Sequence, residues 1–252
     1  MIVLRSVIFN VVFYLVLFVY LIAAMPTLLL PRGALLAMVR NWSRVNLWLL
    51  KVICNIDCEF SGLENIPQGA ALIASKHQSM WETFALITVL DDPAYILKRE
   101  LLWIPFFGWC AAKAEMIPVD RGKRSQALSA MTERARKETE RGREIIIFPE
   151  GTRRAPGAEP KYKYGVAFLY TELGVPCVPV ALNSGLFWPR RSFRRYPGVV
   201  RVAFLPPIEP GLDRQTFYER LQDAIETKTA ELVAMGDRSS RSVRPRESGE
   251  PA

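Results

Sequence analysis

The sequence is very poor in histidine: His77 is the only one among 252 residues. A proton transfer that needs a side chain titrating near neutral pH therefore has one obvious candidate. Cysteine is sparse as well, with four copies and no C-x-x-C pair. With a single histidine these thiols form no zinc pattern. Three of them lie in apolar surroundings, which is typical of reduced, buried thiols, and the sequence predicts no metal site.

Charge is nearly absent from residues 2–30, where Arg5 is the only charged side chain. At about 1.5 Å per residue this run is long enough to cross a hydrocarbon core of roughly 30 Å. A cleaved signal peptide is the alternative, but the run is long for a signal sequence and its start is weakly basic. We expect residues 1–31 to be a membrane anchor helix. Basic residues follow at Arg32, Arg40, Arg44 and Lys51, and they predict a cytoplasmic location for the rest of the chain.

The next segment, residues 32–60, mixes apolar side chains with basic ones and contains two tryptophans, Trp42 and Trp48. Its helical part, residues 33–53, is typical of an amphipathic helix at a membrane interface or of a shallow re-entrant arm. A core helix of the following domain fits the same pattern, and both interpretations stay open.

Beyond Gly62, short apolar runs alternate with runs that favour helix. The predicted strands are Ala70–Ala74, Ala94–Leu97, Met116–Val119, Glu144–Phe148, Val178–Leu182 and Val199–Phe204. The predicted helices are Trp81–Leu90, Arg99–Trp103, Ser125–Arg141, Gly165–Leu173 and Arg214–Met235. The alternation predicts an α/β domain over residues 61–235, with a single mixed, largely parallel sheet and flanking helices. The tail, residues 236–252, is rich in Ser, Arg, Pro and Glu and is predicted to be disordered.

His77 lies between a predicted strand and a predicted helix, where open α/β sheets bind ligands. Glu82 follows it with four residues between. Residues five apart on one helix point about 140° away from each other, so the two meet only if His77 precedes the helix. Ser79, three residues before Glu82, is a capping-box spacing that favours this arrangement. The same spacing also allows Glu82 merely to cap the helix, with His77 an ordinary turn residue.

Two further predicted strands end in polar side chains. One is followed by Arg121 and Lys123, and the other by Glu150-Gly151-Thr152-Arg153. Because parallel strands end at one edge of a sheet, these residues are predicted to meet His77 in one cleft. The arginines offer planar forks for a phosphate, and the lysine adds a point charge. Each basic residue alone suits a solvated loop equally, and Glu150-Gly151 alone suits a turn. The three strand ends together favour a site.

The sequence lacks the G-x-S-x-G elbow of a serine nucleophile. Residues 70–182 contain four short blocks: His77–Glu82, Ile117–Arg121, the Phe-Pro-Glu-Gly-Thr-Arg of Phe148–Arg153, and the proline-containing Val175–Val180. In kind and order these blocks resemble those of the glycerophospholipid acyltransferase family, whose best-known members are 1-acylglycerol-3-phosphate acyltransferases. The acid of the family's first block is usually aspartate and here is Glu82, which leaves the acceptor lipid open.

The resemblance implies transfer of a fatty acyl group from a thioester to the free hydroxyl of lysophosphatidic acid, giving phosphatidic acid in phospholipid biosynthesis. His77 would be the general base and Glu82 would orient its ring. The donor would be acyl-CoA or acyl carrier protein, both anionic and suited to a net charge of +8, with no metal or bound cofactor. Membrane lipids would surround the enzyme, in a bacterial inner membrane. The substrate-binding residues would be Arg121, Lys123, Glu150, Gly151, Thr152 and Arg153.

Three alternatives remain open. One is a family member acting on another lysolipid, such as a lyso-ornithine lipid or a lysophospholipid. Another is a non-enzymatic protein of the membrane surface, because residues 187–196 interleave arginines with aromatic side chains, although an exposed basic loop fits equally. A nucleic-acid binder is suggested by the pI of about 9.5. The apolar N-terminus and the lack of a binding motif argue against it, so we expect no nucleic-acid partner.

Overall fold

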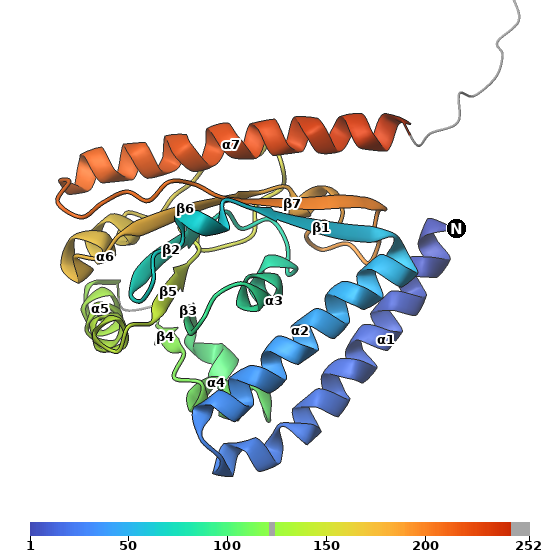
Figure 1. Cartoon of the computed structure of the whole chain (residues 1–252), viewed down its shortest axis with the longest axis horizontal. Helices are drawn as coiled ribbons and strands as arrows, with labels where there is room; N and C mark the ends of the chain where they lie inside the picture. The colour runs from blue at the N-terminus through green and yellow to red at the C-terminus, as the bar shows by residue number, and fades with distance from the viewer. Residues whose placement is uncertain (121–123, 243–252) are drawn as a thin grey trace, which may run out of the picture.

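A seven-stranded sheet organises the chain in the computed structural model, which describes residues 1–120 and 124–242 (Figure 1). The strand order is β1-β7-β6-β2-β5-β3-β4. Every neighbouring pair is parallel except β6 with β7. The predicted mixed, largely parallel sheet is therefore confirmed. The strands are Ile56–Ser61 (β1), Ala71–Ser75 (β2), Pro93–Lys98 (β3), Ile117–Val119 (β4), Glu144–Ile147 (β5), Cys177–Leu182 (β6) and Gly198–Phe204 (β7).

Helices cover both faces of the sheet. Along β2, Ala71 and Ile73 pack among side chains of α1, α2 and α3, whereas Leu72 and Ala74 pack among those of α5, α6 and α7. This alternation follows from the two-residue period of a strand. Figure 1 shows α7 over one face and the α1–α2 pair beyond the other. The α-helices are Ile2–Ala23 (α1), Arg32–Cys54 (α2), Glu82–Ala85 (α3), Phe107–Lys113 (α4), Arg124–Glu140 (α5), Gly165–Leu173 (α6) and Arg214–Ser242 (α7).

The strand β1 was not predicted from the sequence. It lies where the amphipathic segment 32–60 was expected to continue, and it pairs with β7 from Ile56 opposite Gly198 onward. Helix α2 ends earlier, at Cys54, because Asn55 adopts a left-handed conformation (φ 54°) that stops the helix. The boundary predicted at residue 60 therefore falls inside the sheet. The alternation of Ile56, Cys58 and Phe60 with polar residues was the signal of a strand.

Other boundaries also differ from the prediction. The expected helix Trp81–Leu90 is the single α-turn of α3 followed by a 3-10 turn, Leu86–Thr88. The segment Arg99–Trp103 is 3-10 helix, and α4 after it was not predicted. Helix α7 continues to Ser242, past the start of the tail expected to be disordered at residue 236. The rest of that tail, residues 243–252, lies outside the described residues.

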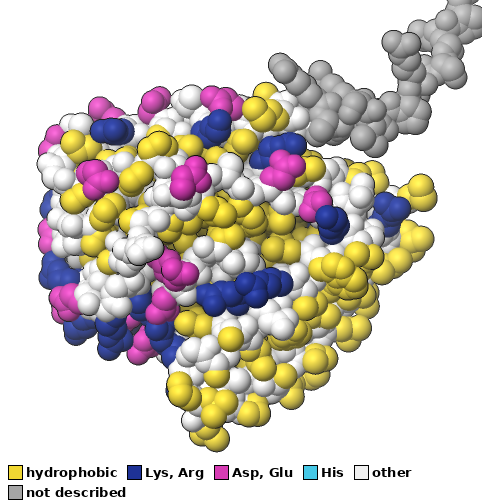
Figure 2. Space-filling view, in the orientation of Figure 1, with side chains coloured by type: hydrophobic (Ala, Val, Ile, Leu, Met, Phe, Trp, Pro, Cys, Tyr) yellow, Lys and Arg dark blue, Asp and Glu magenta, His cyan; other side chains and the backbone are white. Residues whose placement is uncertain are grey.

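Helix α1 faces the domain with a narrow strip and exposes the rest of its apolar surface. Phe9 and Phe13 are buried against Trp188, with ring centroids 5.5 and 5.7 Å from it. Within the residues that the structure describes, Ile2–Leu29 is the one segment with the length and composition to cross a membrane. Figure 2 shows hydrophobic side chains along the outer edge formed by α1 and α2. The apolar side chains of α1 that remain exposed include Leu4, Val11, Leu15, Phe18 and Val19.

Candidate active site

His77 lies just beyond the carboxyl end of β2, in the middle of the sheet. Its ring faces α3, where Nδ1 is 2.9 Å from Oε1 of Glu82. The Glu82 side chain is fully buried, whereas the His77 side chain keeps 14% of its surface exposed. Because a carboxylate only accepts hydrogen bonds, Nδ1 is the donor in this pair, and in the neutral ring Nε2 then has a free lone pair. The predicted meeting of these two side chains is confirmed.

The Glu82 carboxylate also holds the turn that leads into α3. Its Oε1 accepts hydrogen bonds from the backbone N–H groups of Gln78 and Ser79, both at 2.7 Å. The hydroxyl of Ser79 accepts a hydrogen bond from the N–H of Trp81 at 3.1 Å. Helix α3 has its N-cap at Trp81 with no side-chain cap, so Glu82 binds the preceding turn and does not cap the helix. These N–H groups fix the carboxylate beside the histidine.

A residue that sequence reasoning missed completes the surroundings of this carboxylate. Ser184 follows β6 and donates its hydroxyl to Oε2 of Glu82 at 2.7 Å. Strand β6 neighbours β2 in the sheet, so its carboxyl end lies beside the histidine. With both oxygens engaged inside the protein, Glu82 has a fixed position and orientation. No motif pointed to Ser184, because a serine after a strand is ordinary.

The Phe148–Arg153 segment approaches the histidine from the other neighbour of β2, strand β5. The Phe148 ring stacks on the His77 ring, with centroids 4.2 Å apart and planes 22° apart. The backbone N–H of Arg154 donates to the His77 carbonyl at 2.8 Å. The strand ends that carry His77 and the Phe148–Arg153 segment therefore converge as predicted.

A buried charged network lies behind the histidine. Glu150 accepts a hydrogen bond from the His77 backbone N–H at 3.0 Å and forms an ion pair with Lys76 at 2.9 Å. Lys76 also contacts Glu226 of α7 at 2.6 Å, and the hydroxyl of Tyr162 donates to Glu226 at 2.8 Å. Burial raises the pKa of Glu150, and the Lys76 charge opposes that rise. No motif pointed to Glu226, which is one of many charged residues on its helix.

Lys76 holds two carboxylates together, so its replacement is expected to destabilise the fold. Lys76→Met leaves Glu150 buried without its counter-charge, which typically costs about 3–5 kcal/mol. For a chain of this size we expect the thermal unfolding midpoint to fall by roughly 6–20 °C. Lys161→Met, at an exposed lysine, is the control. Lys76→Met/Glu150→Gln should recover part of the loss, and an unchanged midpoint in Lys76→Met would contradict the role of the network.

The other predicted binding residues lie on the loop after Glu150. Gly151 has φ 64°, a conformation that favours glycine, and Thr152 is exposed. Arg153 is half-buried, and its carbonyl accepts a hydrogen bond from Arg190 at 2.7 Å. Within the described part of the chain, the Arg153 guanidinium makes no hydrogen bond or ion pair, so its donors are free for a ligand.

Two predicted site residues, Arg121 and Lys123, lie outside the described residues. The strand that leads to them, β4, is separated from β5 by β3. Arg121 and Arg153 therefore follow strands that are not neighbours in the sheet.

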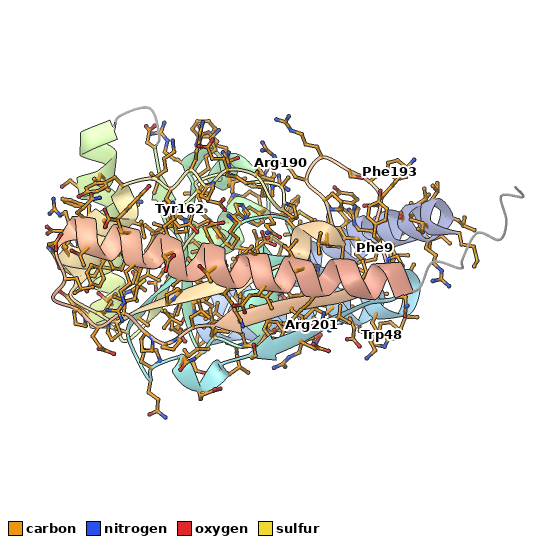
Figure 3. The ribbon with its side chains drawn as sticks, turned by 90° about the horizontal axis from the view of Figure 1, so that it is seen from above. Phe9, Trp48, Tyr162, Arg190, Phe193 and Arg201 are labelled. Atoms are coloured by element: carbon orange, nitrogen blue, oxygen red, sulfur yellow. The ribbon has the colours of Figure 1, made fainter. Side chains whose placement is uncertain are left out.

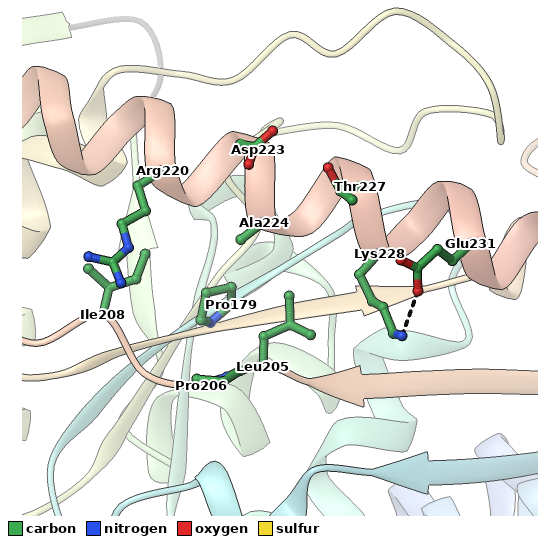
Figure 4. A pocket seen from close by; sticks show the side chains of 10 residues that line it. All are labelled: Pro179, Leu205, Pro206, Ile208, Arg220, Asp223, Ala224, Thr227, Lys228 and Glu231. Carbon is green, nitrogen blue, oxygen red and sulfur yellow. Dashed lines mark hydrogen bonds and ion pairs between the residues drawn. The ribbon is translucent and has the colours of Figure 1, made fainter.

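A cavity of about 340 Å³ between α7 and the segment after β7 is not the candidate site (Figure 4). None of the predicted site residues lines it. Its lysine, Lys228, already forms an ion pair with Glu231 at 2.6 Å. The candidate catalytic side chains lie instead at the edge of the sheet around His77.

Residues 57–183, which include this edge, match a protein-family model described as Acyltransferase. The chain belongs to the acyltransferase family. It is 37% identical over 196 residues to a 1-acyl-sn-glycerol-3-phosphate acyltransferase of Pseudomonas aeruginosa, covering 78% of this chain and 76% of that one. It is 32% identical over 176 residues to the mouse protein named 1-acyl-sn-glycerol-3-phosphate acyltransferase alpha, covering 68% of this chain and 62% of that one.

A solved structure shares the fold of this acyltransferase. It is the crystal structure of the 1-acyl-sn-glycerophosphate acyltransferase of Thermotoga maritima, with a TM-score of 0.77 and 22% identity. The match covers 93% of this chain and 98% of the other. The family predicted from the four sequence blocks is confirmed.

Proposed function

We propose that this acyltransferase moves a fatty acyl group from an acyl thioester to the free hydroxyl of lysophosphatidic acid, giving phosphatidic acid. The observation that carries the proposal is the His77–Glu82 pair, with Nε2 free beside a loop that carries an unpaired arginine. The two relatives are named as 1-acyl-sn-glycerol-3-phosphate acyltransferases, which supports the same acceptor. The reaction places the protein in phospholipid biosynthesis.

His77 acts as the general base in the proposed reaction. Its Nε2 takes the proton of the acceptor hydroxyl while the hydroxyl oxygen attacks the thioester carbonyl. The tetrahedral intermediate then collapses, the carbon–sulfur bond breaks, and the imidazolium returns the proton to the leaving thiolate. The buried Glu82 carboxylate stabilises the imidazolium between these steps. No acyl-enzyme is required, because the thioester is already activated.

The residues around the histidine keep it in position for this step. Phe148 stacks on its ring, and Glu150 holds its backbone N–H. Because its carboxylate is buried and engaged by Lys76, we assign Glu150 a positioning role in place of the substrate contact expected from the sequence. Positioning of this kind accounts for a large share of the rate in transfer reactions.

The acceptor phosphate is proposed to lie on Arg153, with Arg121 and Lys123 as further candidates and Gly151 and Thr152 beside them. A guanidinium fork matches two phosphate oxygens, and that of Arg153 has no competing partner within the described chain. The donor is acyl-CoA or acyl carrier protein. Both are anionic and cytoplasmic, which suits a net charge of +8.

Arg153→Ala is expected to raise the KM for the phosphate-bearing acceptor by about tenfold to a hundredfold. This is the scale of one lost hydrogen bond to a charged group, about 1.5–3 kcal/mol. The KM for the thioester should change far less. Arg153→Lys should restore only part of the affinity, because lysine lacks the fork. A selective rise in the thioester KM would instead assign Arg153 to the donor.

One assay tests the proposed function as a whole. The purified full chain is supplied with acyl-CoA or acyl carrier protein and a panel of lysolipids that differ in headgroup. We expect turnover with lysophosphatidic acid to exceed that with lysophosphatidylcholine or a lyso-ornithine lipid. Faster acylation of another lysolipid would leave the family assignment unchanged and would replace lysophosphatidic acid as the proposed acceptor.

We propose that the enzyme works at a membrane, with its catalytic domain on the cytoplasmic face of a bacterial inner membrane.

A further inference from the structure

A basic loop between β6 and β7 is hydrogen-bonded to helix α1. The loop consists of residues 189–195, and Figure 3 shows its Phe193 on the same side of α7 as Phe9 of α1. Asn10 donates a hydrogen bond to the Phe193 carbonyl at 2.8 Å, and Ser6 accepts one from the backbone N–H of Arg195 at 2.8 Å. These contacts join segments more than 180 residues apart.

Arg195 is a buried cation without an anionic partner. Its residue is 5% exposed, and its guanidinium lies 4.0 Å from the centre of the Trp188 ring. Its Nη2 donates to the side-chain oxygen of Asn10 at 2.8 Å, and its Nη1 donates to the carbonyls of Ser192 and Arg194 at 2.9 and 3.0 Å. All these acceptors are neutral, and its Nε has no hydrogen-bond partner. No carboxylate of the described chain lies within ion-pair distance. Burial lowers its pKa to about 10, so it stays charged at neutral pH. A buried positive charge of this kind favours a bound anion.

A groove of about 550 Å³ runs between this loop and α1. One wall is apolar and comes from α1, where Val7, Val11 and Tyr14 are 46–63% exposed. The other wall is polar or basic and comes from the loop. The groove is lined by Val7, Asn10, Val11, Tyr14, Arg191, Ser192, Phe193 and Arg195. It contains none of the residues around His77.

The sequence leaves this region without negative charge. Aspartate and glutamate are absent from residues 1–56 and from residues 173–208, which contribute both walls. A ligand that fits must offer an anionic group to the arginines and an apolar chain to the helix. Helix α1 is also the segment suited to a membrane, where phospholipids with anionic headgroups present this combination.

We propose that the groove between α1 and residues 189–195 binds one anionic phospholipid of the surrounding bilayer. Its phosphate contacts the exposed Arg191 and lies beside the buried charge of Arg195, and an acyl chain lies along Val7, Val11 and Tyr14. Phe193, 52% exposed, enters the headgroup region beside it. The bound lipid supplies the counter-charge that Arg195 lacks. It also fixes the loop, α1 and the membrane relative to one another.

The test measures lipid binding to the full chain in a neutral detergent by calorimetry. Dioctanoyl phosphatidylglycerol is the probe, and dioctanoyl phosphatidylcholine and inorganic phosphate are the comparisons. We expect saturable binding of the first, at least about tenfold tighter than either comparison, on the scale of a hydrogen bond to a charged group. Equal binding of the zwitterionic lipid would overturn the proposal. Equal binding of inorganic phosphate would identify a free-phosphate site and overturn it too.

Single-arginine variants test whether phosphatidylglycerol binds in this groove. Arg191→Gln removes an exposed loop charge and should weaken phosphatidylglycerol binding about tenfold or more. Arg220→Gln removes an exposed charge on α7 and should leave it unchanged. Arg195→Gln should abolish binding, but it also removes contacts to Trp188 and Asn10, so the Arg191 variant decides. Unchanged binding in Arg191→Gln, or equal weakening in Arg220→Gln, would contradict the assignment. Arg190 is left intact because it contacts Arg153.

Discussion

His77→Ala is expected to lower turnover by about a hundredfold to ten-thousandfold, the range associated with loss of a general base. The sequence has no other histidine, and the described neighbours of this ring are a buried carboxylate and a phenylalanine. No nearby group is therefore available to take the proton from the acceptor hydroxyl. The measurement is kcat with lysophosphatidic acid and an acyl thioester.

Two controls separate chemistry from folding in this experiment. His77→Gln keeps a hydrogen-bonding side chain of similar size but supplies no base, so it should be as inactive as the alanine variant. Both variants should keep their membrane association and should unfold close to the wild-type temperature, because the ring is partly exposed at the edge of the sheet. Wild-type turnover in either variant would exclude His77 as the base and leave the His77–Glu82 pair as a structural contact of the turn before α3.

The parts of the fold that the sequence predicted are those with strong local patterns. The six strands beyond residue 62 consist mainly of apolar residues, although Arg201 interrupts β7, and buried parallel strands favour apolar runs. Strand β1 was missed because it alternates polar and apolar residues directly after an amphipathic helix. Helix α3 was overestimated because an apolar run does not show that the helix lasts only one turn. Composition patterns therefore predict that a helix or strand is present more reliably than they predict where it begins and ends.

The candidate site also contains residues that a local sequence pattern predicted and residues that no local pattern could reveal. His77 and Glu82 are close in sequence, so their spacing and the helix cap were enough to predict that they meet. Phe148–Arg153 was predicted because a parallel sheet brings strand ends together. Glu226 is 150 residues from Lys76, and Ser184 is 102 residues from Glu82. Their contacts depend on tertiary packing, and neither residue type stands out in the sequence. Sequence reasoning therefore found the groups proposed to react and missed those that hold them.

Glu82→Gln is expected to lower kcat by about tenfold to a thousandfold with little change in the fold. The amide keeps the shape: its oxygen still accepts from His77, Gln78 and Ser79, and its NH₂ group donates to Ser184. What disappears is the negative charge beside the imidazolium. An adjacent opposite charge stabilises an ionised group by about 1.4–4 kcal/mol, and the loss appears in the rate because the imidazolium forms during the reaction.

Glu82→Asp keeps the negative charge and shortens the side chain, so it tests the length of the side chain separately from its charge. Aspartate is the usual acid of the family's first block, yet here the carboxylate must meet four donors from the first turn of α3. Shortened by one methylene, it keeps the charge but cannot hold all four contacts without movement of the backbone. We expect it to lower both the unfolding temperature and kcat, whereas Glu82→Gln lowers kcat alone. Unchanged turnover in Glu82→Gln would show that Glu82 serves only to hold the turn before α3, because those hydrogen bonds survive in that variant and the charge does not.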